Sequence, residues 1–115
     1  MNIAVIGLGI IGGSFCKAIK KYTDHYVIGI NRTPETAQKA LNVGAIDEIG
    51  SPEALSKADL VILTMYPQAD IDYIRKNGCF IKKGAVVTDA SGIKSAICPL
   101  LKELAQKYGF VFVGS

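Results

Sequence analysis

The glycines near the amino terminus have a spacing that suits phosphate binding. Gly7, Gly9 and Gly12 form the pattern G-x-G-x-x-G between an apolar run and a segment of helical periodicity. Gly7 would permit a tight turn, Gly9 would let a pyrophosphate approach the backbone, and Gly12 would let the helix pack closely on the strand. A glycine-rich turn without a ligand is the alternative. The pattern predicts a pyrophosphate site at the start of a helix, formed by Gly7, Leu8, Gly9, Ile10, Ile11 and Gly12.

The residues after the second apolar run bear on the choice of cofactor. In a site for NAD, an acidic residue at the end of the second strand binds the 2′-hydroxyl of the ribose. Here that position is Asn31, followed by Arg32 and Thr33. A neutral Asn31 would not repel a 2′-phosphate, and Arg32 could pair with it or be only a surface charge. We therefore predict that Asn31, Arg32 and Thr33 bind the cofactor and favour NADP over NAD.

Two later segments carry further polar candidates. Thr64, Met65, Tyr66 and Pro67 follow a buried apolar run, and we expect them beside the nicotinamide or at the start of a helix. Ser91 lies after the fifth apolar run, where it could face a substrate or cap the next helix.

Apolar runs alternate with segments of helical period along the whole chain, which indicates crossovers between parallel strands. One domain over residues 1–115 is expected, an α/β Rossmann-type, doubly wound parallel sheet of about six strands with helices on both faces. In the helix from Ile11, the residues expected on the apolar face are Ile11, Phe15, Ala18, Ile19 and Tyr22. The strands are expected at residues 3–6, 26–30, 45–49, 60–64, 85–88 and 110–113, with the last helix over about 94–107.

Composition excludes several classes of function. The 115 residues carry a net charge of +3, which is too mild and scattered to indicate nucleic-acid binding. With one histidine, His25, and three separated cysteines, a metal site is not expected. The longest apolar stretch near the amino terminus is shorter than the ~18 residues of a membrane span, and no basic segment precedes it. We expect a cytoplasmic protein with reduced thiols and no membrane partner.

The order of these motifs resembles the prephenate dehydrogenase family. The resemblance lies in residues 7–14, Gly44-Ala45-Ile46-Asp47, residues 58–63, and Val87-Thr88-Asp89 with Lys94. It implies oxidative decarboxylation of prephenate or arogenate by hydride transfer to NADP or NAD, in tyrosine biosynthesis. It also implies a second, helical domain that forms a homodimer and much of the substrate site.

The sequence departs from the family at two points. The family has a serine two residues before the lysine, where this chain has Gly92; Ser91, one place earlier, is the candidate catalytic serine. The catalytic histidine of the family follows the last strand of this domain, beyond Ser115, so we expect this chain alone to be inactive. The alternatives are the nucleotide domain of a β-hydroxyacid dehydrogenase, of an imine or pyrroline-carboxylate reductase, or of a methyltransferase, and a stand-alone NAD(P)-sensing module.

Overall fold

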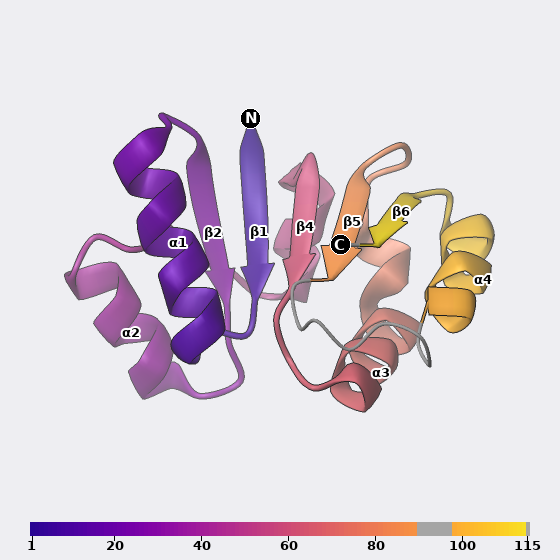
Figure 1. Cartoon of the computed structure of the whole chain (residues 1–115), viewed down its shortest axis with the longest axis horizontal. Helices are drawn as coiled ribbons and strands as arrows, with labels where there is room; N and C mark the ends of the chain where they lie inside the picture. The colour runs from indigo at the N-terminus through magenta and orange to yellow at the C-terminus, as the bar shows by residue number, and fades with distance from the viewer. Residues whose placement is uncertain (90–97, 115) are drawn as a thin grey trace.

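The chain forms one parallel sheet with helices on both faces, as predicted (Figure 1). The computed structural model describes residues 1–89 and 98–114. Within them the strand order is β3-β2-β1-β4-β5-β6, with every neighbouring pair parallel. The elements are β1 (Asn2–Ile6), α1 (Ile10–Tyr22), β2 (Tyr26–Ile30), α2 (Pro34–Asn42), β3 (Glu48–Ile49), η1 (Pro52–Lys57), β4 (Leu60–Leu63), α3 (Pro67–Asn77), η2 (Gly78–Phe80), β5 (Val86–Asp89), α4 (Cys98–Tyr108) and β6 (Val111–Gly114).

Two apolar clusters cover the two faces of the sheet. On one face, Ile3 and Val5 of β1 pack with residues of α1 and α2. On the other, Ala4 and Ile6 of β1 pack with residues of η1, α3 and α4. Since neighbouring residues of a strand point to opposite faces, the unbroken apolar run in β1 is what allows both faces to be covered.

The third strand is shorter than predicted, at Glu48–Ile49 instead of residues 45–49. Ala45 still belongs to the turn that ends α2, because its N–H donates to Ala40 O at 2.9 Å. The carboxylate of Asp47 accepts from Val27 N–H at 2.8 Å, so a side chain takes the place of a ladder bond. Tertiary hydrogen bonds of this kind are not visible in a hydropathy pattern.

The apolar face predicted for the first helix is right at Ile19 but wrong at Phe15, Ala18 and Tyr22. Phe15 and Tyr22 are 40% and 75% exposed, whereas Cys16 is completely buried and Ile19 is half-buried. The physical reason is the contact of Gly12 with Gly7, which turns the glycine side of α1 toward the sheet. Positions four and seven residues after Gly12 then point inward with it.

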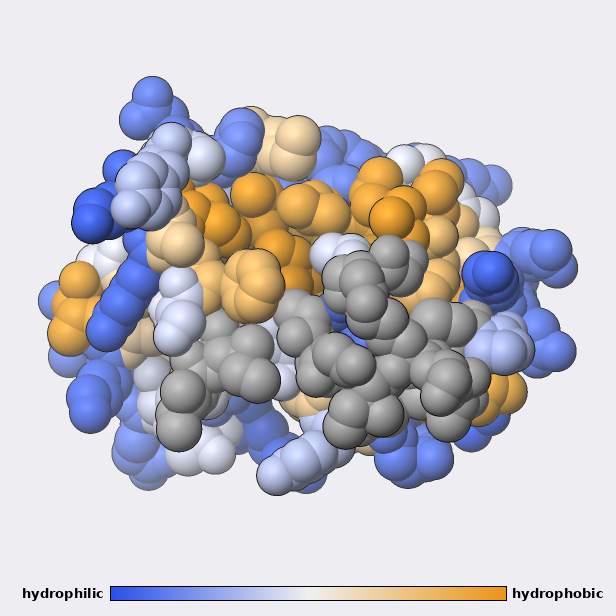
Figure 2. All heavy atoms as spheres, in the orientation of Figure 1, coloured by the Kyte–Doolittle hydropathy of each residue, from blue (hydrophilic) through white to orange (hydrophobic). Residues whose placement is uncertain are grey.

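One part of the sheet is uncovered in the described structure. On the face that carries α1 and α2, no described helix lies over β5 and β6 (Figure 1). Figure 2 shows apolar side chains gathered there, and Val111 and Val113 of β6 are each 50% exposed. Among the described residues, no helix is long and apolar enough to cross a membrane.

Candidate functional site

The turn between β1 and α1 has the geometry that its glycines predict. Gly7 has a φ of +93°, which favours glycine, and a Cβ on Gly12 would overlap the carbonyl oxygen of Gly7. A Cβ on Gly9 would meet nothing within 4 Å, so open space lies beside this residue. Gly9 is also the N-cap of α1, and no side chain caps the helix. The free amides and the open space together provide room and hydrogen-bond donors for an anion.

Thr64, directly after β4, is packed against the same turn. Its Oγ1 lies 2.8 Å from Ile6 O and 2.6 Å from Gly7 O, and its backbone N–H donates to Ile6 O. The threonine therefore joins the ends of β1 and β4 and holds the carbonyl of Gly7 in place. This positions the turn for whatever binds beside it.

Asn31, directly after β2, holds the glycine turn from the other side. Its Oδ1 accepts from Leu8 N–H at 2.9 Å, and its Nδ2 donates to Thr33 O at 3.1 Å. The Leu8 side chain lies in the apolar core and not in the cleft described next. Leu8 thus contributes its backbone to the site.

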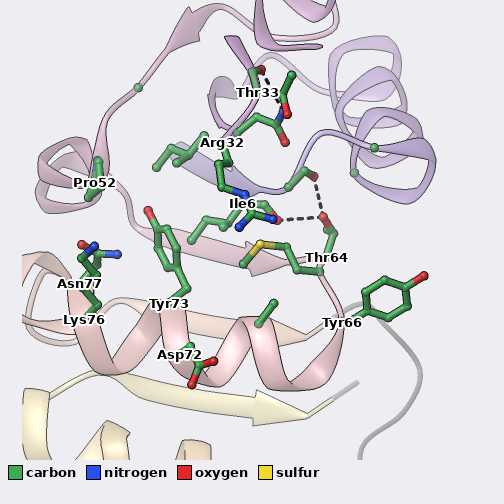
Figure 3. Close-up of a pocket in the computed structure, with 18 of the residues that line it drawn as sticks. Ile6, Arg32, Thr33, Pro52, Thr64, Tyr66, Asp72, Tyr73, Lys76 and Asn77 are labelled. Carbon is green, nitrogen blue, oxygen red and sulfur yellow. Dashed lines mark hydrogen bonds between the residues drawn. The ribbon is translucent and has the colours of Figure 1, made fainter. Parts of the chain in front are cut away.

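A cleft of about 1010 Å³ runs along this edge of the molecule (Figure 3). It brings together the candidates from three separate loops, namely Gly7, Gly9, Gly12, Asn31, Arg32, Thr33, Thr64, Met65 and Tyr66. Ile10 and Ile11 form the first turn of α1, and Pro67 begins α3. Ser91 lies outside the described residues.

Several lining residues were missed from the sequence. They come from the segment after β3 and from one side of α3, and they are Gly50, Ser51, Pro52, Ala69, Asp72, Tyr73, Lys76 and Asn77. The spacing of Ala69, Asp72, Tyr73 and Lys76 places them on one face of a helix, which is a signal that the sequence does carry. Which face of α3 turns toward β1 depends on packing, and the spacing alone does not reveal it.

Two groups on α3 have strongly shifted acidities. Burial, and then the charge of nearby Asp89, raise the pKa of Asp70 to about 8. One oxygen of Asp70 accepts from Met65 N–H at 3.2 Å, so this carboxyl holds the loop that borders the cleft. Burial, and then the charge of Glu53, raise the pKa of Tyr73 to about 12. Both side chains are therefore mainly protonated at neutral pH, and Tyr73 remains a hydrogen-bond donor.

The single histidine lies away from the cleft. His25 precedes β2, at the opposite edge of the sheet, where its Nδ1 lies 3.2 Å from the nitrogen of Met1. The described residues also contain no group of three or more His, Cys, Asp or Glu side chains that could hold a metal ion.

A parallel sheet of this strand order, with a glycine turn at an uncapped helix and a cleft along that edge, defines a Rossmann-type nucleotide-binding domain. The family model for the nucleotide-binding domain of prephenate dehydrogenase matches residues 15–115. The chain belongs to the prephenate dehydrogenase family. This confirms the family resemblance.

Individual relatives agree with this assignment. Prephenate dehydrogenase of Lactococcus lactis subsp. cremoris is 30% identical over 98% of the chain, which spans 32% of that protein. Arogenate dehydrogenase of Synechocystis superposes with a TM-score of 0.89 at 30% identity, over 99% of this chain and 40% of that one. Prephenate dehydrogenase from A. aeolicus, in complex with hydroxyphenyl propionate and NAD+, superposes with a TM-score of 0.83 at 27% identity. The match covers 99% of this chain and 40% of that one. The chain thus spans about a third of the length of the curated relatives that it matches.

Proposed function

We propose that this chain binds a nicotinamide dinucleotide along the cleft, with the pyrophosphate at the first turn of α1. The observation that carries the proposal is the open space beside Gly9 at the uncapped start of the helix. Arg32 and Thr33 line the cleft directly after β2, where the adenosine would bind. The loop from Thr64 to Tyr66 lies at the carboxyl end of β4, where the nicotinamide would bind.

We further propose that NADP is preferred over NAD. Asn31 places no negative charge beside the ribose, and its amide is already held by Leu8 and Thr33. Arg32 is exposed at the cleft, so its guanidinium is free to move onto a 2′-phosphate without leaving a buried partner. An Arg–phosphate pair is among the stronger polar contacts that proteins make.

The reaction that we propose for the longer family protein is the oxidation and decarboxylation of prephenate or arogenate. When bound, the cofactor supplies the acceptor for the hydride, and this domain holds and orients it. The substrate proposal rests on the names of the relatives and on the family to which the chain belongs. Homodimerisation through a second domain, and a catalytic role for Ser91, remain hypotheses from the sequence.

The binding proposal is tested with NADPH fluorescence and the variant Gly9→Val. Because a Cβ at Gly9 would meet nothing within 4 Å, this variant should fold as the wild type does, while its side chain fills the space proposed for the pyrophosphate. We expect NADPH binding to weaken at least tenfold with little change in Tm. Gly13→Ala, one turn into α1, is the control and should bind normally. Equal affinity of wild type and Gly9→Val would refute the placement.

We also propose that the 115-residue chain has no dehydrogenase turnover by itself, because His25 lies at the opposite edge of the sheet from the cleft. The assay mixes the chain with NADP+ and prephenate or arogenate and follows absorbance of NADPH. No NADPH should form. Steady production of NADPH would show that residues within this chain suffice for catalysis.

A further inference from the structure

Tyr73 places an unexplained polar group beside the cleft. Its side chain rises from α3 toward the side that carries Pro52 and lines the cleft opposite Arg32 (Figure 3). The hydroxyl oxygen is inaccessible to solvent, with less than 1 Å² exposed, and it has no hydrogen-bond partner among the described residues. Buried hydroxyls in folded proteins nearly always have a partner. An unpartnered one at the wall of a binding cleft therefore suggests that a bound group supplies it.

The surroundings of this hydroxyl suit a flat, uncharged ring. Ile6, Ile30, Pro52 and Ala69 contribute apolar atoms to the cleft, and Lys76 and Asn77 lie beside Tyr73 (Figure 3). A phosphate placed among the apolar side chains would lose its hydration with little compensation. A purine has two apolar faces and a polar edge, so it matches a cleft that is lined by both apolar and polar side chains.

Two neighbours make room for such a ring. Ala69 lies one turn before Tyr73 on the same side of α3, and its side chain is only a methyl group. Arg32 on the far side of the cleft is exposed, and its planar guanidinium can stack on the face of a purine. The buried phenol is neutral and can donate a hydrogen bond throughout the working range of pH.

We infer that Tyr73 is a specificity-determining residue whose hydroxyl binds the N1 and 6-amino edge of the cofactor's adenine. The inference rests on the proposed function, because it assumes that a dinucleotide occupies this cleft. If the ribose lies at Thr33 and the base extends toward Pro52, the edge of adenine farthest from the ribose faces Tyr73, whose covered hydroxyl must turn into the cleft to reach it. That edge carries a ring nitrogen that accepts a hydrogen bond and an amino group that donates one. A phenol hydroxyl can donate to the first or accept from the second.

The test compares wild type, Tyr73→Phe and the control Tyr22→Phe by calorimetric titration with NADP+ and with 1,N6-etheno-NADP+. The etheno bridge blocks the edge of adenine that Tyr73 is inferred to bind. Tyr22 is exposed on α1, and losing its hydroxyl should change nothing. We expect Tyr73→Phe to weaken NADP+ binding roughly three- to tenfold, the usual value of one hydrogen bond. The preference for NADP+ over the etheno analogue should fall by the same factor.

A thermal melt without ligand separates recognition from a structural role. Because the hydroxyl has no partner in the free protein, Tyr73→Phe should be at least as stable as the wild type, and a loss of Tm would indicate a structural role instead. Equal NADP+ affinity in wild type and Tyr73→Phe would overturn the inference and leave the proposed function standing. Equal losses for both nucleotides would overturn the assignment of the edge. If the wild type binds neither nucleotide nor NAD+, the proposed function fails together with the inference.

Discussion

The backbone N–H of Leu8 donates to Oδ1 of Asn31 at 2.9 Å, which joins the glycine turn to the residue directly after β2. Leu8 follows β1, and Asn31 follows β2, its neighbour in the sheet. Asn31 carries no charge, but its side chain still holds the glycine turn in place. Under the proposed function, this one side chain therefore affects both the shape of the phosphate site and the choice of cofactor.

Replacing Asn31 should therefore affect both properties. Asn31→Ala removes the acceptor for Leu8 N–H and should weaken binding of NADP+ and NAD+ alike, with a loss of stability of about 1 kcal/mol. Asn31→Asp keeps the acceptor but adds a charge beside the ribose, so it should weaken NADP+ binding more than NAD+ binding. Calorimetric titration of both nucleotides checks this. Identical ratios of the two affinities in Asn31→Asp and the wild type would contradict the placement of the ribose.

The close contact of Gly12 with Gly7 gives a prediction about stability. Gly12→Ala forces a methyl group into the carbonyl of Gly7 and to within 2.9 Å of Thr64 Oγ1, so α1 must move away from the sheet. We expect a loss of about 2–3 kcal/mol, within the range known for overpacked sites. Gly13→Ala is the matched control, since its nearest contact would be at 3.8 Å and alanine favours a helix. Denaturation in urea measures both, and equal stability of the two variants would argue against this packing.

The buried carboxyl of Asp70 predicts a dependence of stability on pH. Its pKa in the folded protein is about 8, against 3.8 for an ordinary aspartate. Between these values the unfolded chain has released the proton and the folded chain still holds it, so folding takes up a proton. Through this group, stability is fully retained below pH 4, falls as the pH rises toward 8, and is level above that.

Asp70→Asn should remove this dependence, because an amide keeps an acceptor for Met65 N–H and has no proton to lose. Near pH 8.5 the variant should be more stable than the wild type by about 1–3 kcal/mol, and near pH 4 the difference should be smallest. Urea denaturation across this range provides the measurement. Asp72→Asn, which changes the exposed aspartate two residues later, is the control. Parallel curves for wild type and Asp70→Asn would show that Asp70 carries no such shift.

Much of the fold and part of the candidate site could be predicted because their determinants are local in sequence. The buried run at residues 60–63 and the glycine turn can each be identified from a few neighbouring residues, and all three loops of the cleft follow strands that apolar runs predicted. The inward face of α1 was predicted only in part, because Gly12 contacts Gly7 only in the folded chain. Tyr73 was missed for the same reason, since its role depends on which face of α3 turns toward β1.

The most direct test of the central claim is the ratio of NADP+ to NAD+ affinity, measured by calorimetry for the wild type and Arg32→Ala. Lys83→Ala, which removes an exposed lysine outside the cleft, is the control for net charge. The proposal expects the wild type to bind NADP+ at least tenfold more tightly, and Arg32→Ala to lose most of that preference while NAD+ affinity changes little. An unchanged ratio in Arg32→Ala, or tighter binding of NAD+ by the wild type, would contradict it.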